Sequence, residues 1–573
     1  MSALPTASVP RTSLSNIRYP HPIRALCLGA GREVGRSCVL VEIDQHVIMF
    51  DCGMHMSNHV QFSEKTIDIN KLYEFLHIPT PPAHPSTANQ QYIDLTPYID
   101  CVVITHFHLD HFGSLPLLTE RYNYSGPIYT TAPTVAIGSM MLSDMIKLHN
   151  KRKRTIYNKL DYLYSEHDIE KCMSKVTIVS MYSTIHVNEH VTLSTSYAGH
   201  VIGAAMYTIQ IGAQSILYTG DYNTHDDSHL AAAHTCKPII PPDLLITEST
   251  YATTSHNDKM LGNNAAAIKF VEQLVSCLRS GGKILIPIFA IGKTQELCLL
   301  LDSYWRTHRL NIPIYFSAGI TSQTSNVYRQ YLPYTKPEIQ DSYIDQNIDI
   351  FSFPSITAYT DDVIDRHDPC IVLATPGMLL HGLSLRIFSR WCIDSRNMVV
   401  LPGYCISGTV GNKVIGGMKY IDCELDGRSI TLEVNCQIQY MSFSSHADAN
   451  GIIQFIRYTQ PNNIILVHGE GKQMIQLQKR IHDELHINCV APHNFQSMIF
   501  QPPSHVIAQI DRRLLYPSKP PVLPSQSIHE DKHDTGGSRI TDIQHHNIDT
   551  KRYSFDAKLV VNDKGHIRIV NPA

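Results

Sequence analysis

The chain has 573 residues, which is enough for more than one domain and for a large buried core. Its hydrophobic content of 43% is ordinary for a globular protein, and no apolar run approaches the roughly 20 residues that span a bilayer, so no membrane contact is expected. The net charge of −4 excludes a globally basic nucleic-acid-binding protein, so any polyanion site depends on local residues or metal ions. The 14 cysteines include no Cys-x-x-Cys pair, and residues 1–20 lack the apolar segment of a secretory signal.

The first part of the chain predicts short strands that end in polar residues. Residues 1–20 are rich in serine and proline, which predicts disorder. Strands are expected over residues 23–28, 38–43 and 47–50, with a glycine-rich loop between the first two. That loop is followed by a strand rather than a helix, which excludes a dinucleotide-binding loop. Asp51 follows the third strand and is the first candidate for a site at this edge.

Three histidines and one aspartate then fall within six residues, namely His106, His108, Asp110 and His111. The apolar run before them predicts a buried strand and residues 114–121 predict a short helix, so the four side chains lie on a turn that can aim them at one point. Imidazole and carboxylate groups are ligands that zinc prefers, and four are more than one ion needs from a single turn. The cluster therefore predicts two metal ions side by side, with a histidine-rich surface loop as the alternative.

The same arrangement repeats farther along the chain. Strands are expected over residues 191–196, 215–219 and 244–247, and the last two are largely apolar. They are followed by His200, Asp221 and Glu248, respectively. Because ligands in sheet proteins collect at the carboxyl ends of strands, we expect these side chains to join the same site.

The character of the sequence changes near residue 252. Helices expected over residues 264–280, 294–305 and 383–392 alternate with strands over residues 283–288, 312–317, 370–375 and 398–402, which predicts a parallel α/β sheet. The earlier arrangement returns with His446 and with His468, which follows an expected strand over residues 464–467. The parallel sheet is therefore predicted to be an insertion. Residues 502–546 predict a linker and residues 557–570 a terminal hairpin.

The motif His106-x-His108-x-Asp110-His111, followed by His200, Asp221 and His468, resembles the metallo-β-lactamase hydrolases. Glu248, His446 and the inserted domain resemble the β-CASP branch of that family, which acts on nucleic acids. The resemblance covers about residues 24 to 500 and implies an α/β fold, an αββα sandwich interrupted by a parallel β-CASP domain and followed by a short C-terminal extension. The implied limits are a disordered segment at 1–21, the sandwich at 22–251 and 436–501, the insertion at 252–435, and the linker with its hairpin at 502–573.

The resemblance also implies a set of metal ligands for two Zn²⁺ ions. One ion takes His106, His108 and His200, the other takes Asp110, His111 and His468, and Asp221 bridges both. Asp51 supports the ligands from behind, although it could also bond only to backbone N–H groups of a turn. His200 alone could be a packed core histidine. The metal site would be absent only if all of these alternative structural explanations were true at the same time.

Catalytic roles follow from the same resemblance. Asp110 is a ligand within the reacting centre, and His446 protonates the departing ribose oxygen while Glu248 keeps the imidazole charged and oriented. His446 could instead cap the following helix, but Asp448 is as well placed for that role. The candidate contacts to substrate are Lys293, Tyr404 and Thr409. Lys293 stands where the family usually has arginine, so a phosphate contact there would lack the bidentate fork.

Within the branch, short motifs resemble the endonucleases of nuclear RNA-processing complexes. The implied activity is zinc-dependent cleavage of single-stranded RNA in the nucleus, at the 3′ ends of small nuclear RNAs or of polyadenylated transcripts. The implied partners are a multisubunit complex and an inactive β-CASP homologue. The alternatives are a catalytically dead scaffold, which is expected to lose ligands, a hydrolase for small molecules, which needs no second domain, and a DNA nuclease, which typically lacks the histidine at position 468.

Overall fold

The structure is a computed structural model, and it describes residues 21–55, 67–79, 92–153, 164–234, 241–254, 264–289, 292–317, 326–346, 348–403, 405, 408–425, 427–441, 445–501, 558–561 and 567–570. Residues 21–502 form one compact unit, and the two terminal segments belong to another. The expected disordered segment at 1–20 and the linker at 502–546 lie outside the described residues.

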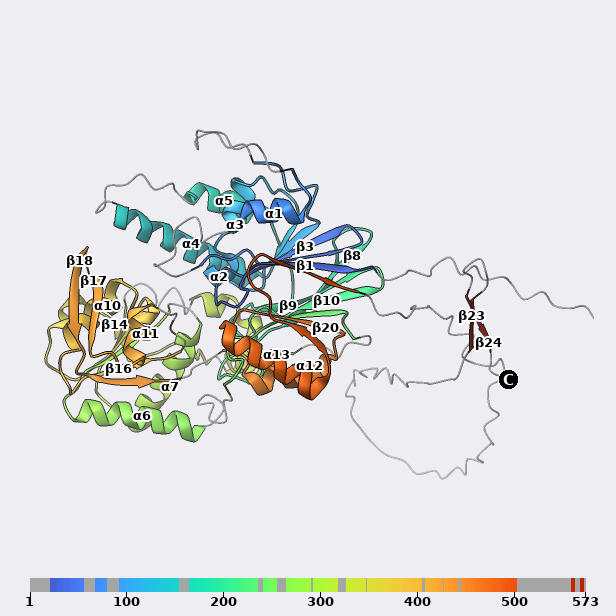
Figure 1. Ribbon diagram of the computed structural model, residues 1–573. Coiled ribbons are helices and arrows are strands. Elements are labelled where there is room, and N and C mark those ends of the chain that lie inside the picture. Colours follow the sequence, from blue (N-terminus) through green and yellow to red (C-terminus); the bar gives the residue numbers. More distant parts are fainter. Residues whose placement is uncertain are drawn as a thin grey trace, which may run out of the picture. The chain divides into compact units, whose positions relative to one another are not determined.

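Two seven-stranded sheets lie face to face (Figure 1). The first has the strand order β22-β1-β2-β3-β4-β5-β6 and comprises β1 (Ile23–Gly29), β2 (Cys38–Ile43), β3 (His46–Phe50), β4 (Cys101–Val103), β5 (Ile128–Thr130), β6 (Val176–Ile178) and β22 (Gln496–Phe500). The second has the order β21-β20-β11-β10-β9-β8-β7 and comprises β7 (Thr184–His186), β8 (Val191–Tyr197), β9 (Ala205–Ile211), β10 (Gln214–Tyr218), β11 (Leu244–Glu248), β20 (Asn463–Val467) and β21 (Asn488–Val490).

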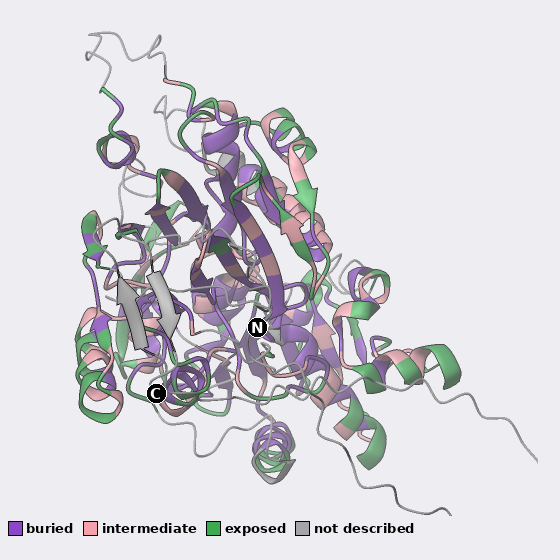
Figure 2. Cartoon of the chain, turned by 90° about the vertical axis from the view of Figure 1, so that its right-hand side faces the viewer, coloured by how far each residue is buried: buried purple, intermediate pink, exposed green. Residues whose placement is uncertain are grey.

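The central strands are apolar on both faces because each sheet is covered on both sides. Side chains such as Val103 and Ile246 fill the space between the sheets. The outer face of the first sheet packs on helices α1 (Ile69–Phe75), α2 (Leu109–Phe112), α3 (Leu115–Glu120), α4 (Ala132–Lys153) and α5 (Glu166–Ser174). The outer face of the second sheet packs on α12 (Ala449–Thr459) and α13 (Gly471–Leu485). Figure 2 shows the result, with buried strands inside and exposed residues on the outer faces of the helices. The predicted αββα sandwich is confirmed.

Strand direction places the ends of the strands that matter for the site. In the first sheet β3, β4, β5 and β6 run parallel, while β2 runs antiparallel to both β1 and β3. In the second sheet β10, β11, β20 and β21 run parallel. Parallel neighbours end at the same edge of a sheet, so the residues that follow β3 and β4, and those that follow β10, β11 and β20, are collected at two common edges.

The third sheet has six strands in the order β14-β13-β15-β12-β16-β19, and all neighbours are parallel. It comprises β12 (Ile284–Pro287), β13 (Ile314–Phe316), β14 (Ile356–Ala358), β15 (Ile371–Ala374), β16 (Met398–Leu401) and β19 (Gln437–Tyr440). The helices of this part of the chain are α6 (Asn264–Arg279), α7 (Lys293–His308), α9 (Pro337–Gln346), α10 (Gly382–Trp391) and α11 (Val410–Ile415). It also contains the short turns η3 (Leu332–Tyr334), η4 (Asp361–Ile364) and η5 (Gly377–Leu379) and a two-stranded ribbon of β17 (Tyr420–Leu425) and β18 (Arg428–Glu433). Leu332 of η3 and Ile339 of α9 pack in the cluster of the second sheet of the sandwich. The predicted parallel α/β domain is confirmed.

The chain returns from the third sheet to the sandwich. Strand β20 pairs with β11, so that Leu245 lies opposite Ile464 more than 200 residues later. The predicted insertion is therefore confirmed. The predicted terminal hairpin is also present, as β23 (Lys558–Val561) and β24 (Ile567–Val570).

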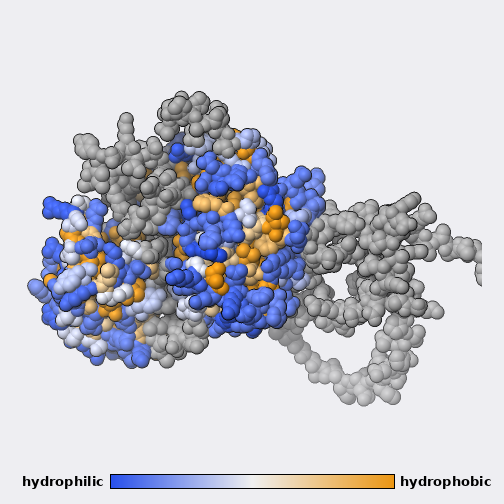
Figure 3. Space-filling model, viewed as in Figure 1, coloured by the Kyte–Doolittle hydropathy of each residue, from blue (hydrophilic) through white to orange (hydrophobic). Residues whose placement is uncertain are grey.

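The surface of the described residues is mostly polar. Hydrophilic residues cover much of the face in Figure 3, and hydrophobic residues form small groups between them. Within the described ranges, none of the helices combines the length and the apolar character that a bilayer crossing requires.

Candidate active site

The residues that the sequence singles out gather at the carboxyl ends of five strands. Asp51 follows β3, the cluster 106–111 follows β4, Asp221 follows β10, and His468 follows β20 directly. Glu248 is the last residue of β11. Side chains from both sheets meet at one edge of the sandwich, since Asp110 of the first sheet's cluster and His468 after β20 of the second lie 3.1 Å apart.

The histidine-rich turn is held by the segment that follows β3. The N–H groups of Cys52 and Met54 donate to the carbonyls of His111 and Leu109 at 2.8 and 2.9 Å. Gly53 lies between them, and a Cβ atom there would stand 1.8 Å from the carbonyl oxygen of Asp110, so only glycine fits. The predicted short helix over residues 114–121 is confirmed as α3, and a separate single turn that the sequence did not predict, α2, precedes it and carries Asp110 and His111. This backbone packing aims the four side chains at the site.

The first ligand cluster consists of His106, His108, His200 and Asp221. His108 Nδ1 lies 2.9 Å from His106 Nε2 and 3.2 Å from His200 Nε2. Asp221 Oδ2 lies 3.7 and 3.8 Å from the same two Nε2 atoms. A tetrahedral zinc ion with bonds of about 2.0–2.1 Å holds its ligand atoms roughly 3.3 Å apart, so the cluster has the dimensions of a zinc site.

The second cluster consists of Asp110, His111 and His468. Asp110 Oδ2 lies 3.1 Å from His468 Nε2 and 3.9 Å from His111 Nε2. Asp221 reaches this cluster as well, because its Oδ2 lies 3.3 Å from His111 Nε2. Asp221 Oδ2 therefore lies within 4 Å of imidazole nitrogens of both clusters, as a bridging carboxylate must.

The nitrogen atoms that face away from the clusters are tied to other groups. His106 Nδ1 lies 3.0 Å from Thr105 Oγ1, and His200 Nδ1 lies 3.0 Å from the carbonyl of Ser445. Histidines that bind metals almost always donate their other N–H in this way, which leaves the lone pair of the remaining nitrogen for the ion. Asp221 Oδ1 is buried and accepts no hydrogen bond from the described residues. The donor set and this orphaned oxygen fit a pair of divalent ions.

Asp51 lies behind the clusters and is fully buried. Its Oδ2 accepts from His111 Nδ1 and from the Tyr218 hydroxyl, each at 2.8 Å. Its Oδ1 accepts from the N–H of Thr105 at 2.8 Å. The backbone of Asp51 is left-handed, with φ of 57°, a conformation that aspartate tolerates better than most residues. Asp51 thus orients His111 and the histidine-rich turn together.

Electrostatics keep the first cluster in the form that binds cations. Burial and the neighbouring imidazoles hold the pKa of His106 and that of His200 well below the usual range, and burial lowers the pKa of His108 to about 4. Burial raises the pKa of Asp221, but the imidazoles around it outweigh burial and leave the pKa well below normal. These imidazoles are therefore neutral and the carboxylate charged at neutral pH, as metal ligands must be.

A second charged pair stands beside the clusters. His446 Nδ1 donates to Glu248 Oε2 at 2.7 Å, and it lies 3.8 Å from Asp221 Oδ2. Burial lowers the pKa of His446, but the carboxylates of Glu248 and Asp221 outweigh it and raise the pKa above the usual value. Asp448, not His446, caps helix α12, since its side chain accepts from the N–H of Gly451 at 2.7 Å. The raised pKa favours the protonated form of His446, and Asp448 supplies the N-cap of α12.

Known proteins share these features over most of the chain. The sequence matches a metallo-beta-lactamase superfamily domain over residues 83–246, a Beta-Casp domain over residues 294–414 and a Zn-dependent metallo-hydrolase RNA specificity domain over residues 431–492. It is 43% identical to Integrator complex subunit 11 of Gallus gallus over 84% of this chain and 75% of that protein. The chain belongs to the β-CASP family of metallo-β-lactamase hydrolases.

This β-CASP hydrolase is also similar to two further named proteins. Integrator complex subunit 11 homolog of Dictyostelium discoideum is 40% identical over 86% of this chain and 63% of that protein. Cleavage and polyadenylation specificity factor subunit 3-II of Arabidopsis thaliana is 37% identical over 85% of this chain and 74% of that protein. Family membership and the His/Asp clusters make the chain a hydrolase with a metal-binding site.

The loop that follows Asp221 also attaches the third sheet to the sandwich of this β-CASP hydrolase. Glu296 on α7 is fully buried and accepts from the N–H of Ser228 and from His229 Nδ1, each at 2.8 Å. A buried carboxylate is stable only when such donors surround it. The bonds link the first turn of α7 to the segment that follows Asp221.

The predicted substrate contacts are described less completely. Tyr404 and the side chain of Lys293 lie outside the described residues, although position 293 is the first residue of α7. Thr409 is buried, and its hydroxyl accepts from the N–H of Asn412 at 3.1 Å as the N-cap of α11. Contacts between these residues and substrate remain predictions.

Sequence reasoning missed the groups that hold the ligands in place. Tyr218 bonds to Asp51, Thr105 bonds to His106, and Thr250 bonds to Glu248 at 2.6 Å. All three are polar residues within two positions of a predicted ligand or catalytic residue, or at the end of an apolar strand. Polar residues at such positions are a signal that could have found them.

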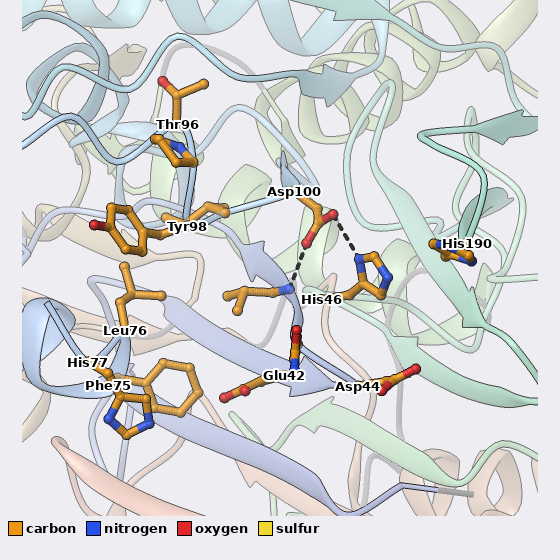
Figure 4. A pocket seen from close by; sticks show the side chains of 14 residues that line it. Glu42, Asp44, His46, Phe75, Leu76, His77, Thr96, Tyr98, Asp100 and His190 are labelled. Atoms are coloured by element: carbon orange, nitrogen blue, oxygen red, sulfur yellow. Dashed lines mark hydrogen bonds and ion pairs between the residues drawn. The ribbon is translucent and has the colours of Figure 1, made fainter. Parts of the chain in front are cut away.

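A polar pocket of the same chain lies at the other end of the first sheet, where β3 begins (Figure 4). Asp100 lies within it and accepts from His46 Nδ1 at 2.9 Å and from the N–H of Val47 at 2.8 Å. Asn188 also donates to Asp100, at 2.8 Å. These polar groups bond to one another, and the ligand clusters lie at the opposite ends of the strands.

Proposed function

We propose that this β-CASP hydrolase is a zinc-dependent endonuclease that cleaves single-stranded RNA in nascent nuclear transcripts. The observation that carries the proposal is the hydrogen-bonded pair of His446 and Glu248 beside two adjoining ligand clusters that Asp221 contacts. A charged imidazole next to a dication site is the arrangement that phosphodiester hydrolysis needs, because the leaving oxygen requires a proton. We assign one Zn²⁺ to each cluster.

Each residue has a defined task in this proposal. Two bound metal ions activate water and neutralise phosphate charge. His446 donates its proton to the departing ribose 3′ oxygen, and Glu248 holds the imidazole in place and stabilises its charge. Asp51 keeps His111 oriented from behind. The products then carry a 3′ hydroxyl and a 5′ phosphate.

The choice of RNA is supported by the match to an RNA specificity domain and by the names of the relatives. The choice of an Integrator-type complex is supported by identity. Relatives named Integrator complex subunit 11 share 43% and 42% of residues with the chain, against 37% and 35% for those named cleavage and polyadenylation specificity factor. Processing of small nuclear RNA 3′ ends is therefore proposed ahead of pre-mRNA cleavage.

The same relatives support membership of a multisubunit complex in the nucleus, and we include an inactive β-CASP homologue as the partner. The hairpin of β23 and β24 is only two strands, and an isolated pair is marginally stable, so a partner there is plausible physically. Affinity purification from the native cell tests this part. Recovery of Integrator subunits supports it, and recovery of polyadenylation subunits instead overturns it.

Turnover on three substrates tests the proposed activity. Zinc-loaded protein is mixed with single-stranded RNA, with single-stranded DNA of the same sequence and with a small ester. Cleavage of RNA that is lost in Asp110→Ala and His446→Ala protein supports the proposal. Undiminished cleavage by either variant, or a preference for the ester, overturns it. A folded wild-type chain that binds fewer than two zinc ions points instead to a non-catalytic scaffold.

A further inference from the structure

Thr250 lies just after β11, at the junction of three segments that are far apart in the sequence. It is 6% exposed, and its hydroxyl contacts Glu248, His446 and His468. We propose that Thr250 is a positioning residue that fixes the tautomer of His468 for metal binding and ties that ligand to the pair of Glu248 and His446. The inference rests on the proposed function, because it concerns the proposed zinc site and its general acid.

The hydroxyl can make few bonds, so its partners can be assigned. A threonine hydroxyl has one proton to donate and two lone pairs to accept with. Oγ1 lies 2.6 Å from Glu248 Oε2, 2.9 Å from His468 Nδ1, 3.1 Å from the backbone carbonyl oxygen of His468 and 3.4 Å from His446 Nδ1. The proton goes to Glu248, because a bond to a carboxylate is shorter and stronger than a neutral one. The lone pairs of Oγ1 then face the imidazoles.

The competing donor is already satisfied. His446 Nδ1 donates to Glu248 Oε2 at 2.7 Å, which is much shorter than its distance to Thr250. Thr250 Oγ1 therefore accepts a hydrogen bond from the N–H of His468 Nδ1. Asp221 Oδ1 is the other acceptor near His468 Nδ1, but it is farther away, at 3.4 Å.

This assignment determines which nitrogen of His468 can bind a metal. A proton on Nδ1 leaves the lone pair on Nε2, and Nε2 lies 3.1 Å from Asp110 Oδ2 within the second cluster. The opposite tautomer would aim an N–H at the metal position. One hydroxyl thus holds His468 in its ligating form while it also orients the carboxylate that holds His446.

The neighbouring Ser249 provides a matched control. It is also fully buried, and its hydroxyl joins the same two segments by donating to the carbonyl of Val467 at 2.7 Å. That bond involves none of the proposed ligands or catalytic residues. Loss of the Ser249 hydroxyl therefore reproduces the general cost of removing a buried hydrogen bond at this junction, without the effect on His468.

The experiment compares zinc binding by the full chain as wild type, Thr250→Val, Thr250→Ser and Ser249→Ala. Valine keeps the shape and removes the hydroxyl, whereas serine restores it. Zinc affinity is measured by competition with a chromophoric chelator, and kcat and KM are measured on single-stranded RNA. We expect Thr250→Val to bind the more weakly held zinc ion about 10- to 100-fold less tightly, the usual effect of losing a group that orients a metal ligand. We expect Thr250→Ser and Ser249→Ala to bind both ions as the wild type does, and the loss in Thr250→Val to appear in kcat rather than KM.

The inference is overturned if Thr250→Val keeps both ions at wild-type affinity, if Thr250→Ser fails to restore binding, or if Ser249→Ala loses zinc to the same extent. Should Thr250→Val not fold, Thr250→Ala serves for the same comparison. A wild-type chain that binds fewer than two zinc ions overturns the proposed function itself. A wild-type chain that binds two ions, together with an unaffected Thr250→Val variant, overturns this inference alone.

Discussion

Replacement of Glu248 by glutamine separates charge from shape at the proposed general acid. The carboxylate is buried and accepts three hydrogen bonds, one on Oε1 from the N–H of Tyr222 at 2.8 Å and two on Oε2 from Thr250 and His446. Glutamine offers only one oxygen. If the amide oxygen of glutamine takes the place of Oε2, the amide NH₂ group faces the N–H of Tyr222. If the amide group is turned round, Thr250 and His446 lose their acceptor instead.

The first orientation is favoured, because it leaves one buried donor unpaired rather than two. An unpaired buried donor costs about 1–3 kcal/mol, so Glu248→Gln is expected to reduce the free energy of unfolding by that amount. The hydrogen bond to His446 survives in this orientation. What is lost is the negative charge that raises the pKa of His446.

The sign of the pH effect follows from the role of the proton. His446 must be protonated to act as an acid, so the rate falls as pH rises through its pKa. Because Glu248 raises that pKa, the fall is expected to begin at lower pH in Glu248→Gln protein. The variant should match the wild type most closely at acid pH and lose up to the roughly 10²- to 10⁴-fold contribution of a general acid at alkaline pH.

The assay is single-turnover cleavage of a short single-stranded RNA by zinc-loaded protein across a pH series. His446→Ala is the matched control, and its rate should be low and should lack this limb of the profile. Zinc content is measured in parallel, to show that the ligand clusters are intact. A constant ratio of Glu248→Gln to wild-type rates at all pH values would refute the reasoning.

Three further predictions concern the ligands and the junction between the sheets. Asp221→Asn should lose both zinc ions on chelator titration, since Asp221 contacts both clusters, and retention of either ion would count against a bridging role. Tyr218→Phe should lower zinc affinity by about 10- to 100-fold through Asp51 while the chain stays folded, and unchanged affinity in the same titration would show that this bond is not needed. Glu296→Gln should reduce the free energy of unfolding in denaturant by about 1–3 kcal/mol, because one buried donor loses its acceptor, and an unchanged midpoint would contradict that.

The sequence predicts the strands well because the signal is local. Runs such as 244–246 are apolar throughout, which is typical of strands buried on both faces, and the polar residues that follow each run mark where it ends. The alternation of helices and strands after residue 252 likewise predicts the parallel sheet. Parallel strands then bring their carboxyl ends together, so the candidate site could be predicted from spacing and fold class.

The side chains that support the ligands could not be predicted in the same way, because each lies far along the sequence from the residue that it contacts. Tyr218 lies 167 residues from Asp51, and Thr250 lies 218 residues from His468. Which buried hydroxyl meets which ligand is decided by the register of neighbouring strands and by side-chain packing. The buried bonds of Glu296 are hidden for the same reason, since a glutamate on the first turn of a helix is usually explained by its favourable interaction with the helix dipole.

The most direct test of the account uses a circular single-stranded RNA, which has no ends. Zinc-loaded protein, alone or in the complex purified from its native cell, is expected to open the circle into linear RNA with a 5′ phosphate and a 3′ hydroxyl. Asp110→Ala protein is expected to leave it closed. An intact circle under conditions in which the wild-type protein degrades linear RNA, or a circle opened equally well by the variant, would contradict a metal-dependent RNA endonuclease.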